Sequence, residues 1–359
     1  MSFHSSRSAC TFRAGTAGFT LVEVMVALTI GLFVLAALSA VFYKSSQTRH
    51  ETERSARQIE NGLYAMQLLS TDLQQAGFYG EFDPDVLATP AAKPDPCATA
   101  VALLKDALPI LVQGYDGAAG ASIPSCISDL REGTDIVVIR RTSTCVRGSV
   151  DCEGTVAGTP YFQASLCANG AELASGNSAN WYALDTVNAN LTMHQRDCAT
   201  GADIRRYRVH IYFIANNNVP GDGMPTLKRA ELGGDAGTTA FTIVPLVEGV
   251  ENLQLEYGID NDGDGAPDAF TADPDSYSCS GAACVTNWRN VTAVRVNVLV
   301  RNTEQSADYN DAKTYTLGHK ADGTDNVFPA SGTYGDHYKR HVYTAEVRMR
   351  NPAGRRMVP

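Results

Sequence analysis

The stretch Gly18-Phe19-Thr20-Leu21-Val22-Glu23 opens an apolar run that continues from Val24 to Phe42 without a further charge. A helix from Phe19 to Phe42 would span about 36 Å, enough to cross a hydrocarbon core of about 30 Å. A carboxylate at the centre of a bilayer costs about 2.5–3.5 kcal/mol in insertion when it stays unpaired. The sequence therefore predicts a membrane-length helix in which Glu23 needs a partner.

The length of this apolar run distinguishes a retained membrane anchor from a cleaved signal peptide. A cleaved secretory signal has an apolar core of only about 7–15 residues, so we expect the segment to remain in the mature protein as an anchor. Two alternatives stay open. One is a conventional signal peptide cut after Ala37-Leu38-Ser39. The other is a plain membrane anchor that contains Glu23 by chance.

Residues Gly18 to Glu23 resemble the processing signal of type IV prepilins and the related pseudopilins. The resemblance implies that a prepilin peptidase cuts between Gly18 and Phe19 and that Phe19 becomes the N-methylated N-terminus. It also makes Glu23 the acidic residue at the fifth mature position, with a role in assembly. No proline interrupts the run, whereas many major pilins carry one, and this favours a minor component.

The same resemblance divides the chain and orients it. The leader carries Arg7 and Arg13 and no acidic residue, so the positive-inside bias keeps it in the cytoplasm. We expect a single-pass protein of the inner membrane with a periplasmic C-terminal domain. The expected parts are a cleaved leader (1–18), a transmembrane half-helix (19–42), a periplasmic half-helix (43–77) and a β-rich domain with disulfide-braced loops (78–359).

The helix should continue beyond the membrane, because apolar residues keep recurring at intervals of three and four. We predict one helix from Thr20 to Ala76, ended by Gly77. Its apolar stripe should pack on a globular domain, with a coiled coil as the alternative. The stripe is Ile59, Leu63, Met66, Leu69 and Leu73, with Arg54, Arg57, Glu60 and Asp72 elsewhere on the cylinder.

The rest of the chain is rich in Gly, Asn, Asp, Thr and Ser, and its apolar residues alternate. This pattern predicts one buried strand and several half-buried strands with one polar face. The fold class is therefore α+β, with a long N-terminal helix packed on a β-sheet-rich domain, and the resemblance to prepilins implies the ladle shape of a pilin. The buried strand is Asp135–Arg140, and the half-buried ones are Tyr207–Ile214, Leu253–Tyr257, Val294–Arg301 and Val342–Arg350.

Nine cysteines are present, and Cys10 lies in the predicted leader. The eight that remain favour disulfides in an oxidising compartment, and the absence of two-residue spacing argues against a zinc site. The short spacings favour local bridges between Cys145 and Cys152 and between Cys279 and Cys284. The other four would then pair among themselves in an order that the sequence leaves open; they are Cys97, Cys126, Cys167 and Cys198.

The segment from Asp260 to Asp268 places carboxylates at alternate positions around glycines, like the first half of a calcium loop. Thr271 replaces the glutamate that ends an EF-hand loop, and a strand precedes the segment, so it is not an EF-hand. A possible calcium ion and a solvated hairpin loop are both consistent with it. The proposed ligands are Asp260, Asp262, Asp264, Asp268 and the carbonyl of Ala266.

Composition argues against nucleic-acid binding and catalysis. The net charge of −10 offers no basic stripe for DNA. The chain contains no His-Glu-x-x-His, Gly-x-Ser-x-Gly or phosphate-binding glycine motif, so we expect no enzyme. Basic residues near the end have two open readings, contact with an acidic neighbour or a charged outer strand face, and we expect the second; they are Lys339, Arg340, Arg348, Arg350, Arg355 and Arg356.

Further segments look like the minor pilins called PilW: Leu73–Gly80, Gly133–Val137, Tyr257–Asp260 and the stretch from Arg340 to Asn351. This resemblance implies a subunit that joins other minor pilins in a complex at the pilus tip and primes assembly. The implied partners are other minor pilins, the major pilin, the prepilin peptidase, the inner-membrane assembly platform and a large tip protein. Two alternatives remain: a pseudopilin of a type II secretion system, or a calcium-dependent adhesin at the pilus tip.

Overall fold

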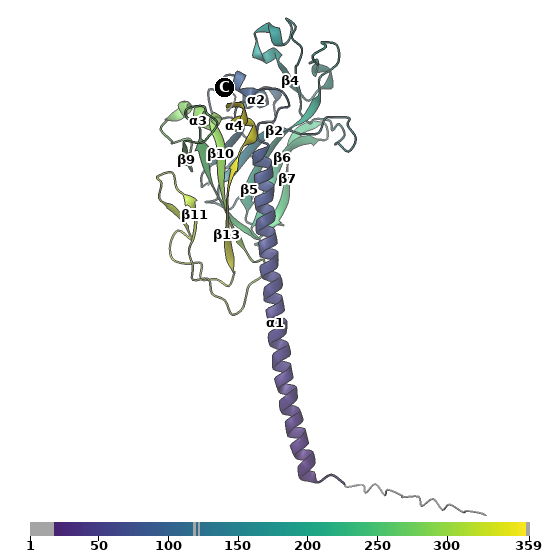
Figure 1. The fold of residues 1–359 in the computed structure, drawn as a ribbon, viewed down its shortest axis with the longest axis vertical. Helices are drawn as coiled ribbons and strands as arrows, with labels where there is room; N and C mark the ends of the chain where they lie inside the picture. The colour runs from purple at the N-terminus through teal and green to yellow at the C-terminus, as the bar shows by residue number, and fades with distance from the viewer. Residues whose placement is uncertain (1–17, 118–119, 121–122, 357–359) are drawn as a thin grey trace, which may run out of the picture. The chain divides into compact units, whose positions relative to one another are not determined.

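The computed structural model describes residues 18–117, 120 and 123–356. The chain forms two compact units, Met1–Glu53 and Arg54–Pro359. Helix α1 starts in the first unit and ends in the second, and every strand lies in the second (Figure 1). The leader, with Arg7, Cys10 and Arg13, lies largely outside the described residues. The helices are α1 (Leu21–Gln74), α2 (Val101–Asp106), α3 (Val285–Arg289) and α4 (Arg350–Arg356).

The second unit contains three β-sheets. A seven-stranded sheet has the path β1-β2-β5-β3-β4, with β6 paired to β5 and β7 to β6. A four-stranded sheet has the order β13-β10-β8-β9, and β11 pairs with β12. The strands are β1 (Val112–Tyr115), β2 (Ile136–Thr142), β3 (Tyr161–Ala164), β4 (Tyr182–Asp185), β5 (Ile204–Ala215), β6 (Thr226–Asp235), β7 (Thr238–Glu248), β8 (Val250–Ile259), β9 (Ala269–Thr271), β10 (Val291–Arg301), β11 (Tyr315–His319), β12 (Asp325–Phe328) and β13 (Arg340–Arg348). This architecture confirms the predicted fold class.

The ends of α1 have local causes. The hydroxyl of Thr20 accepts a hydrogen bond from the backbone N–H of Glu23 at 3.3 Å, so Thr20 caps the helix and does not belong to it. At the other end Gly77 adopts a φ of +70°, which suits glycine. The N–H of Gly77 donates to the carbonyl of Arg140 at 2.9 Å, which turns the chain toward β2.

The predicted apolar stripe of α1 was only partly correct. Met66, Leu69 and Leu73 are buried, but Ile59 and Leu63 are exposed. The buried face is rotated toward small and polar residues because Gly62 lets the ring of Tyr343 approach closely; a Cβ at Gly62 would lie 2.2 Å from that ring. The buried residues of α1 are Gln58, Gly62, Ala65, Met66, Leu69, Asp72 and Leu73.

Two hydrophobic clusters bury the two faces of the seven-stranded sheet. Strand β2 shows this directly: Val137 and Ile139 join the cluster that also contains α1 and the four-stranded sheet. Ile136 and Val138 join the cluster on the opposite side, with α2, β3 and β4. The continuous apolar run of β2 follows from this double burial, as the sequence predicted.

The prediction of half-buried strands was wrong for β5, β8 and β10. In β5 the segment from Val209 to Ile214 is buried on both faces, because the strand lies between the two hydrophobic clusters. The polar faces of β8 and β10 are buried too, because β11 and β12 cover them. His319 lies 3.0 Å from the carboxylate of Glu256, and the amide of Asn326 donates to Gln254 at 2.8 Å. The polar residues on this face are therefore hydrogen-bonded beneath the hairpin, as buried polar groups usually are.

Arg340 is the clearest exception to the predicted charged outer face. Its side chain is fully buried and meets three carboxylates, at 2.5 Å from Glu251, 2.8 Å from Asp311 and 2.6 Å from Asp336. The ring of Tyr334 lies 3.6 Å from the guanidinium. These contacts tie the segment between β10 and β13 to the four-stranded sheet. Removing one partner of such a buried pair is strongly destabilising.

Asp72 provides a second buried polar anchor, between the last turn of α1 and the seven-stranded sheet. Its carboxylate accepts hydrogen bonds from Arg141 at 2.6 Å and from the hydroxyl of Tyr212 at 2.8 Å. The Nδ1 of His210 lies 2.6 Å from the same carboxylate. Burial opposes ionisation of Asp72, but His210 and Arg141 outweigh it and hold the pKa of Asp72 below its usual range. Burial lowers the pKa of His210, although the neighbouring Asp72 carboxylate acts in the opposite direction.

The anchor predicts how stability depends on pH. Because the pKa of Asp72 is depressed, its contribution is present above an unfolded pKa of about 3.9 and is lost as the pH falls below that value. Because the pKa of His210 is also lowered, stability declines as the pH falls below about 6.5. We expect Asp72→Asn to lose about 3–5 kcal/mol at pH 7 and to show a shallower acid dependence. Thermal unfolding of the full chain in detergent from pH 3 to pH 8 measures both effects, and parallel curves for the two proteins would exclude this role.

Candidate assembly and metal sites

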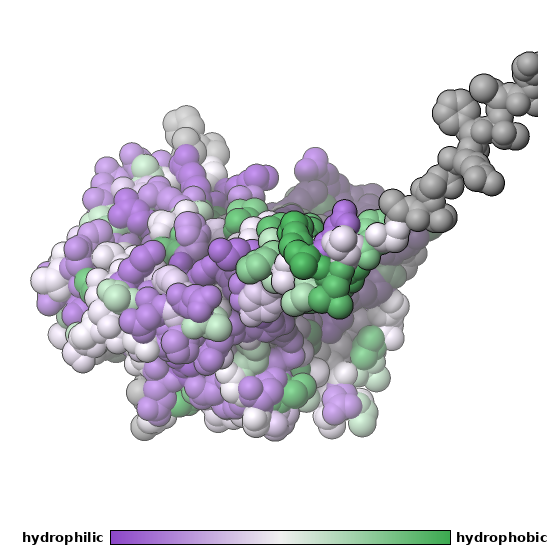
Figure 2. All heavy atoms as spheres, turned by 90° about the horizontal axis from the view of Figure 1, so that it is seen from below, coloured by the Kyte–Doolittle hydropathy of each residue, from purple (hydrophilic) through white to green (hydrophobic). Residues whose placement is uncertain are grey.

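The first candidate site is the N-terminal segment of α1. One helix among the described residues, α1, is long and apolar enough to cross a membrane, and its most apolar segment is not buried. In Figure 2 the hydrophobic residues gather on the part of α1 that faces the viewer, and most of the remaining visible surface is hydrophilic. Such an exposed apolar helix needs a non-aqueous environment.

Glu23 lies in the first turn of this segment. The side chain is exposed, and its carboxylate has no ion-pair partner in the part of the chain that the structure describes. Phe19, two residues before the helix begins, is 81% exposed. The carboxylate and the new terminus expected at Phe19 therefore lie within about one helical turn of each other along the chain. Either group can reach a neighbouring molecule.

The second candidate site is the loop between β8 and β9. Carboxylate oxygens of Asp260, Asp262 and Asp268 lie within 4.8 Å of one another. Asp264 is outside this group and accepts a hydrogen bond from the N–H of Ala266 at 2.7 Å. The structure thus brings together three of the four carboxylates that the sequence suggested as ligands.

Asp260 is buried beneath this loop and already has several partners. It accepts hydrogen bonds from the N–H groups of Gly263 at 2.7 Å and Gly265 at 3.0 Å. Arg356 of α4 donates to the same carboxylate at 3.1 Å. Burial raises the pKa of Asp260, but Arg356 and the two amides outweigh this and hold it below its ordinary value. The loop is thereby preformed, and a cation at this site would share Asp260 with a guanidinium.

Four disulfides brace the second unit. Cys145 is joined to Cys152 and Cys279 to Cys284, the two local pairs expected from their spacing. The remaining bridges join residues farther apart in the sequence: Cys97 to Cys126, and Cys167 to Cys198. The sequence left this last choice open, because only the fold brings those cysteines together.

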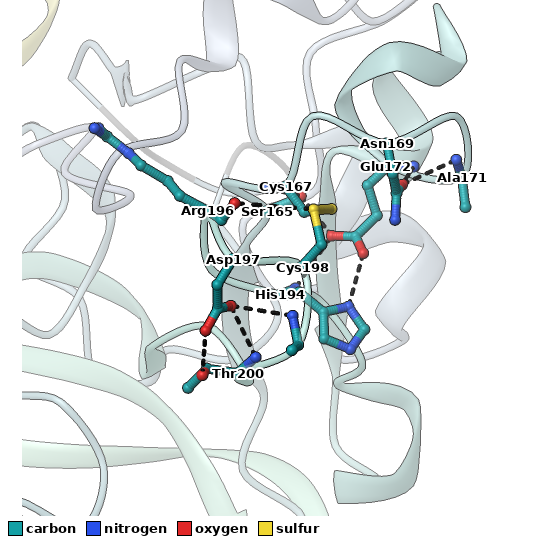
Figure 3. The surroundings of a disulfide bond; sticks show 11 residues. Ser165, Cys167, Asn169, Ala171, Glu172, His194, Arg196, Asp197, Cys198 and Thr200 are labelled. Atoms are coloured by element: carbon teal, nitrogen blue, oxygen red, sulfur yellow. Dashed lines mark hydrogen bonds and ion pairs between the residues drawn. A yellow bond between two sulfur atoms is a disulfide. The ribbon is translucent and has the colours of Figure 1, made fainter.

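A polar network surrounds the Cys167–Cys198 bridge (Figure 3). Glu172 accepts a hydrogen bond from Ser165 at 2.5 Å and lies 2.7 Å from the Nδ1 of His194. Burial raises the pKa of Glu172, but these two partners outweigh it and lower the pKa overall. Asp197 accepts hydrogen bonds from Thr200, which lower the pKa of Asp197 to about 2. The bridge thus holds two loops whose turns are fixed by side-chain hydrogen bonds.

Comparison with known protein families gives two matches. Residues 13–39 match the prokaryotic N-terminal methylation motif. Residues 211–351 match the type IV pilus-assembly protein W family, PilW. The chain thus combines a prepilin-type N-terminal motif with a C-terminal segment similar to the PilW family. The PilW match runs from within β5 to the start of α4, and it includes the Asp260 loop and the buried Arg340.

The other comparisons add less. No curated protein matched the chain in sequence. Among solved structures, a type IV-like pilin from Thermus thermophilus matches with 13% identity and a TM-score of 0.27, over 61% of this chain and 78% of that one. The PilW family model describes a type IV pilus-assembly protein. The motif and the single apolar helix are consistent with membrane anchoring.

Sequence reasoning missed two residues that shape these sites. Arg356 reaches Asp260 across a sequence separation of 96, and no local pattern signals such a contact. Asp72 was placed off the apolar stripe of the helix, but it is buried, like the neighbouring Leu73. The absence of a nearby lysine or arginine at helical spacing was the available hint that its partner is not on α1.

We expect the loss of stability on removing a disulfide to increase with the length of the loop that it closes. Replacing Cys167 and Cys198 together by serine opens a loop of separation 31. In the chain-entropy model this costs about 3–4 kcal/mol. The same replacement of Cys279 and Cys284, with separation 5, should cost only about 2 kcal/mol. Urea unfolding of the full chain in detergent measures the difference, and a larger loss for the short loop would contradict this ranking.

Proposed function

We propose that this chain is a minor pilin that joins other minor pilins in a tip complex and primes assembly of a type IV pilus. The observation that carries the proposal is Glu23, an exposed carboxylate in an exposed apolar helix, directly after a prepilin cleavage sequence. The PilW-type domain on the same chain supports a pilus role over a secretion system. In this proposal the peptidase cuts after Gly18, the second unit lies in the periplasm, and the assembled subunit ends at the pilus tip.

The physical reason for assembly lies in the unpaired charge. In a bilayer Glu23 has no partner from its own described chain, and this is unfavourable. In a bundle of pilin helices the amino group of Phe19 on an adjacent subunit supplies a cation in a water-poor core. A buried pair is stable only when both partners are present. Leaving the membrane for the bundle therefore satisfies the charge.

Glu23→Ala tests this role. We expect the variant to be processed and inserted but not assembled, because the partner amino group is left unpaired at a cost of about 3–5 kcal/mol. That corresponds to more than about a hundredfold in an assembly equilibrium. The measurement is the number of pili per cell in a strain whose only copy of the chain carries the substitution. Piliation at the unmodified level would refute the role of Glu23.

Two further variants complete the design. Glu53→Ala removes another carboxylate of α1, outside the apolar run, and should leave piliation unchanged. Gly18→Ala should block the peptidase and leave the whole leader attached, which intact-mass measurement detects. Normal processing of Gly18→Ala would place the cleavage elsewhere.

We also propose that the loop between β8 and β9 binds calcium. Asp260, Asp262 and Asp268 offer hard oxygen ligands in one place, and calcium prefers such ligands. Arg356 would share Asp260 with the ion, so the affinity should fall in the weak range of about 10⁻⁴–10⁻³ M seen for extracellular modules. A bound ion would stiffen the loop.

Calcium titration of the full chain in detergent, followed by calorimetry and thermal unfolding, tests the site. We expect saturable binding and a higher melting temperature at millimolar calcium. Asp262→Asn should abolish both effects, whereas Asp264→Asn, outside the group of three, should retain them. Absence of heat and of any melting shift in the unmodified chain would remove the site.

A further inference from the structure

Two long strands end sheets in the second unit, β7 and β13. Each pairs with a single neighbour, β6 and β10 respectively. Helix α1 lies between them: Asn61 donates to the carbonyl of Glu248 at the end of β7, and Gln58 donates to the carbonyl of Lys339 just before β13. Figure 1 shows α1 running between the two labels. An exposed sheet edge is a template for another strand unless it is protected.

The edge of β7 is protected. The hairpin between β6 and β7 has a two-residue turn, so Asp235 and Thr238 form a hydrogen-bonded pair. Hydrogen-bonded and non-hydrogen-bonded pairs alternate along the two strands, and on this count the backbone nitrogen of Pro245 points away from β6. Proline has no N–H to offer. The register also shifts between Leu227 and Lys228, and the hydroxyl of Thr239 donates to the carbonyl of Gly158 near the other end. Proline and irregular pairing are the usual means of blunting an edge.

The edge of β13 has none of these features. Its nine pairs with β10 show no register shift, and the strand contains no proline. Just beyond its ends, Asn302 donates to the carbonyl of Lys339 and Met349 to that of Thr292. Since hydrogen-bonded pairs alternate, the amides of Val342, Thr344 and Glu346 point away from β10. No backbone hydrogen bond from these three reaches any described part of the chain.

An exposed apolar surface of α1 flanks this edge. Gly62 packs on Tyr343 of β13. With 3.6 residues per turn, Ile59 and Leu63 lie about 60° and 100° from Gly62 around the helix axis, both in the same direction. Asn61, which contacts β7, lies about 100° from Gly62 in the opposite direction. Ile59 and Leu63 are therefore on the β13 flank, where they are 51% and 58% exposed. Within the second unit, the positions of α1 at about 60° to 140° on this flank carry no charge, and the first charged position beyond them is Glu60, at about 160°. They are Ala56, Ile59, Leu63, Gln67, Ser70 and Gln74.

We propose that β13 and this flank of α1 dock an extended segment of another pilus subunit, which adds as a strand to the four-stranded sheet. The proposal rests on the proposed function. The free amides and carbonyls of β13 match the backbone of a strand, and alternate side chains of the added strand would cover Ile59 and Leu63. Its charge pattern follows from the two faces. The side chains over α1 are uncharged and apolar, because that flank has no charge to pair.

The opposite face of the added strand is polar. There it meets the exposed side of β13, where Arg295 and Glu346 form an ion pair at 3.0 Å with both side chains partly exposed. Added this way, the strand turns an edge that would otherwise promote aggregation into a specific contact. Ile59 and Leu63, which the fold leaves exposed, would be buried by the same event.

Thr344→Pro tests the edge with little disturbance, because proline is tolerated in an edge strand where the lost N–H points outward. Thr344→Pro and Thr344→Ala both lose the hydroxyl that donates to Asn297 at 2.8 Å. We expect Thr344→Pro to unfold at nearly the same temperature as Thr344→Ala but to reduce piliation by at least about tenfold, as β-augmentation depends on main-chain hydrogen bonds. Thr344→Ala, which keeps the N–H, should assemble normally. Normal piliation with Thr344→Pro would overturn the proposal.

Hydrogen exchange gives a second readout that does not depend on how Thr344→Pro folds. The detergent-solubilised complex of the full chain with co-produced pilins is compared with the chain alone. We expect the amides of Val342, Thr344 and Glu346 to exchange at least about tenfold more slowly in the complex, while Phe241 and Ile243 of β7 are unchanged. Unchanged exchange along β13, or protection along β7 instead, contradicts the proposal. Concentration-dependent protection in the chain alone would show a second copy as the occupant and overturn the choice of partner.

Failure here is separable from failure of the proposed function. If Glu23→Ala abolishes piliation while β13 stays unprotected, the chain is an assembling pilin that does not use this edge. If Ile59→Asn with Leu63→Asn also assembles normally, the flank of α1 has no docking role. The edge proposal requires both variants of this surface to fail in assembly.

Discussion

The fold of the second unit depends on how one helix is held against two sheets. The C-terminal part of α1 packs through Ala65, Met66, Leu69 and Leu73, and buried hydrogen bonds at two points add to this contact. Asp72 binds Arg141, His210 and Tyr212 at one end. Gln58 donates to the carbonyls of Val300 and Lys339 three to four turns earlier. In the rotation of α1 that makes these contacts, Ile59 and Leu63 are exposed.

A second buried charge serves the segment between β10 and β13. Arg340 gathers Glu251, Asp311 and Asp336 in one place, so a long excursion of the chain returns to a defined position. The same segment supplies β11 and β12, which cover the polar faces of β8 and β10. Both anchors cost desolvation and are retained only while every partner is present. The two anchors therefore favour one defined packing of these segments over other compact packings.

The sequence was informative where a local rule applies. The length of the apolar run and the acidic residue within it predicted the helix and its prepilin character, and short cysteine spacings pointed to the local bridges. It was less informative where the outcome depends on contacts between distant segments. Ile59 fits an apolar stripe as well as Leu69 does, and only the close approach of Tyr343 to Gly62 decides which is buried. Likewise, nothing local distinguishes the buried Arg340 from an exposed arginine.

The central claim is that this chain is a processed prepilin whose mature form enters a pilus. The most direct measurement is mass spectrometry of the N-terminal peptide of the chain, isolated from pili sheared from the cell surface. The account predicts a peptide that begins with N-methylated Phe19 and contains Glu23. A chain that still begins at Met1, or one that is missing from the sheared pili while present in the membrane, would contradict it.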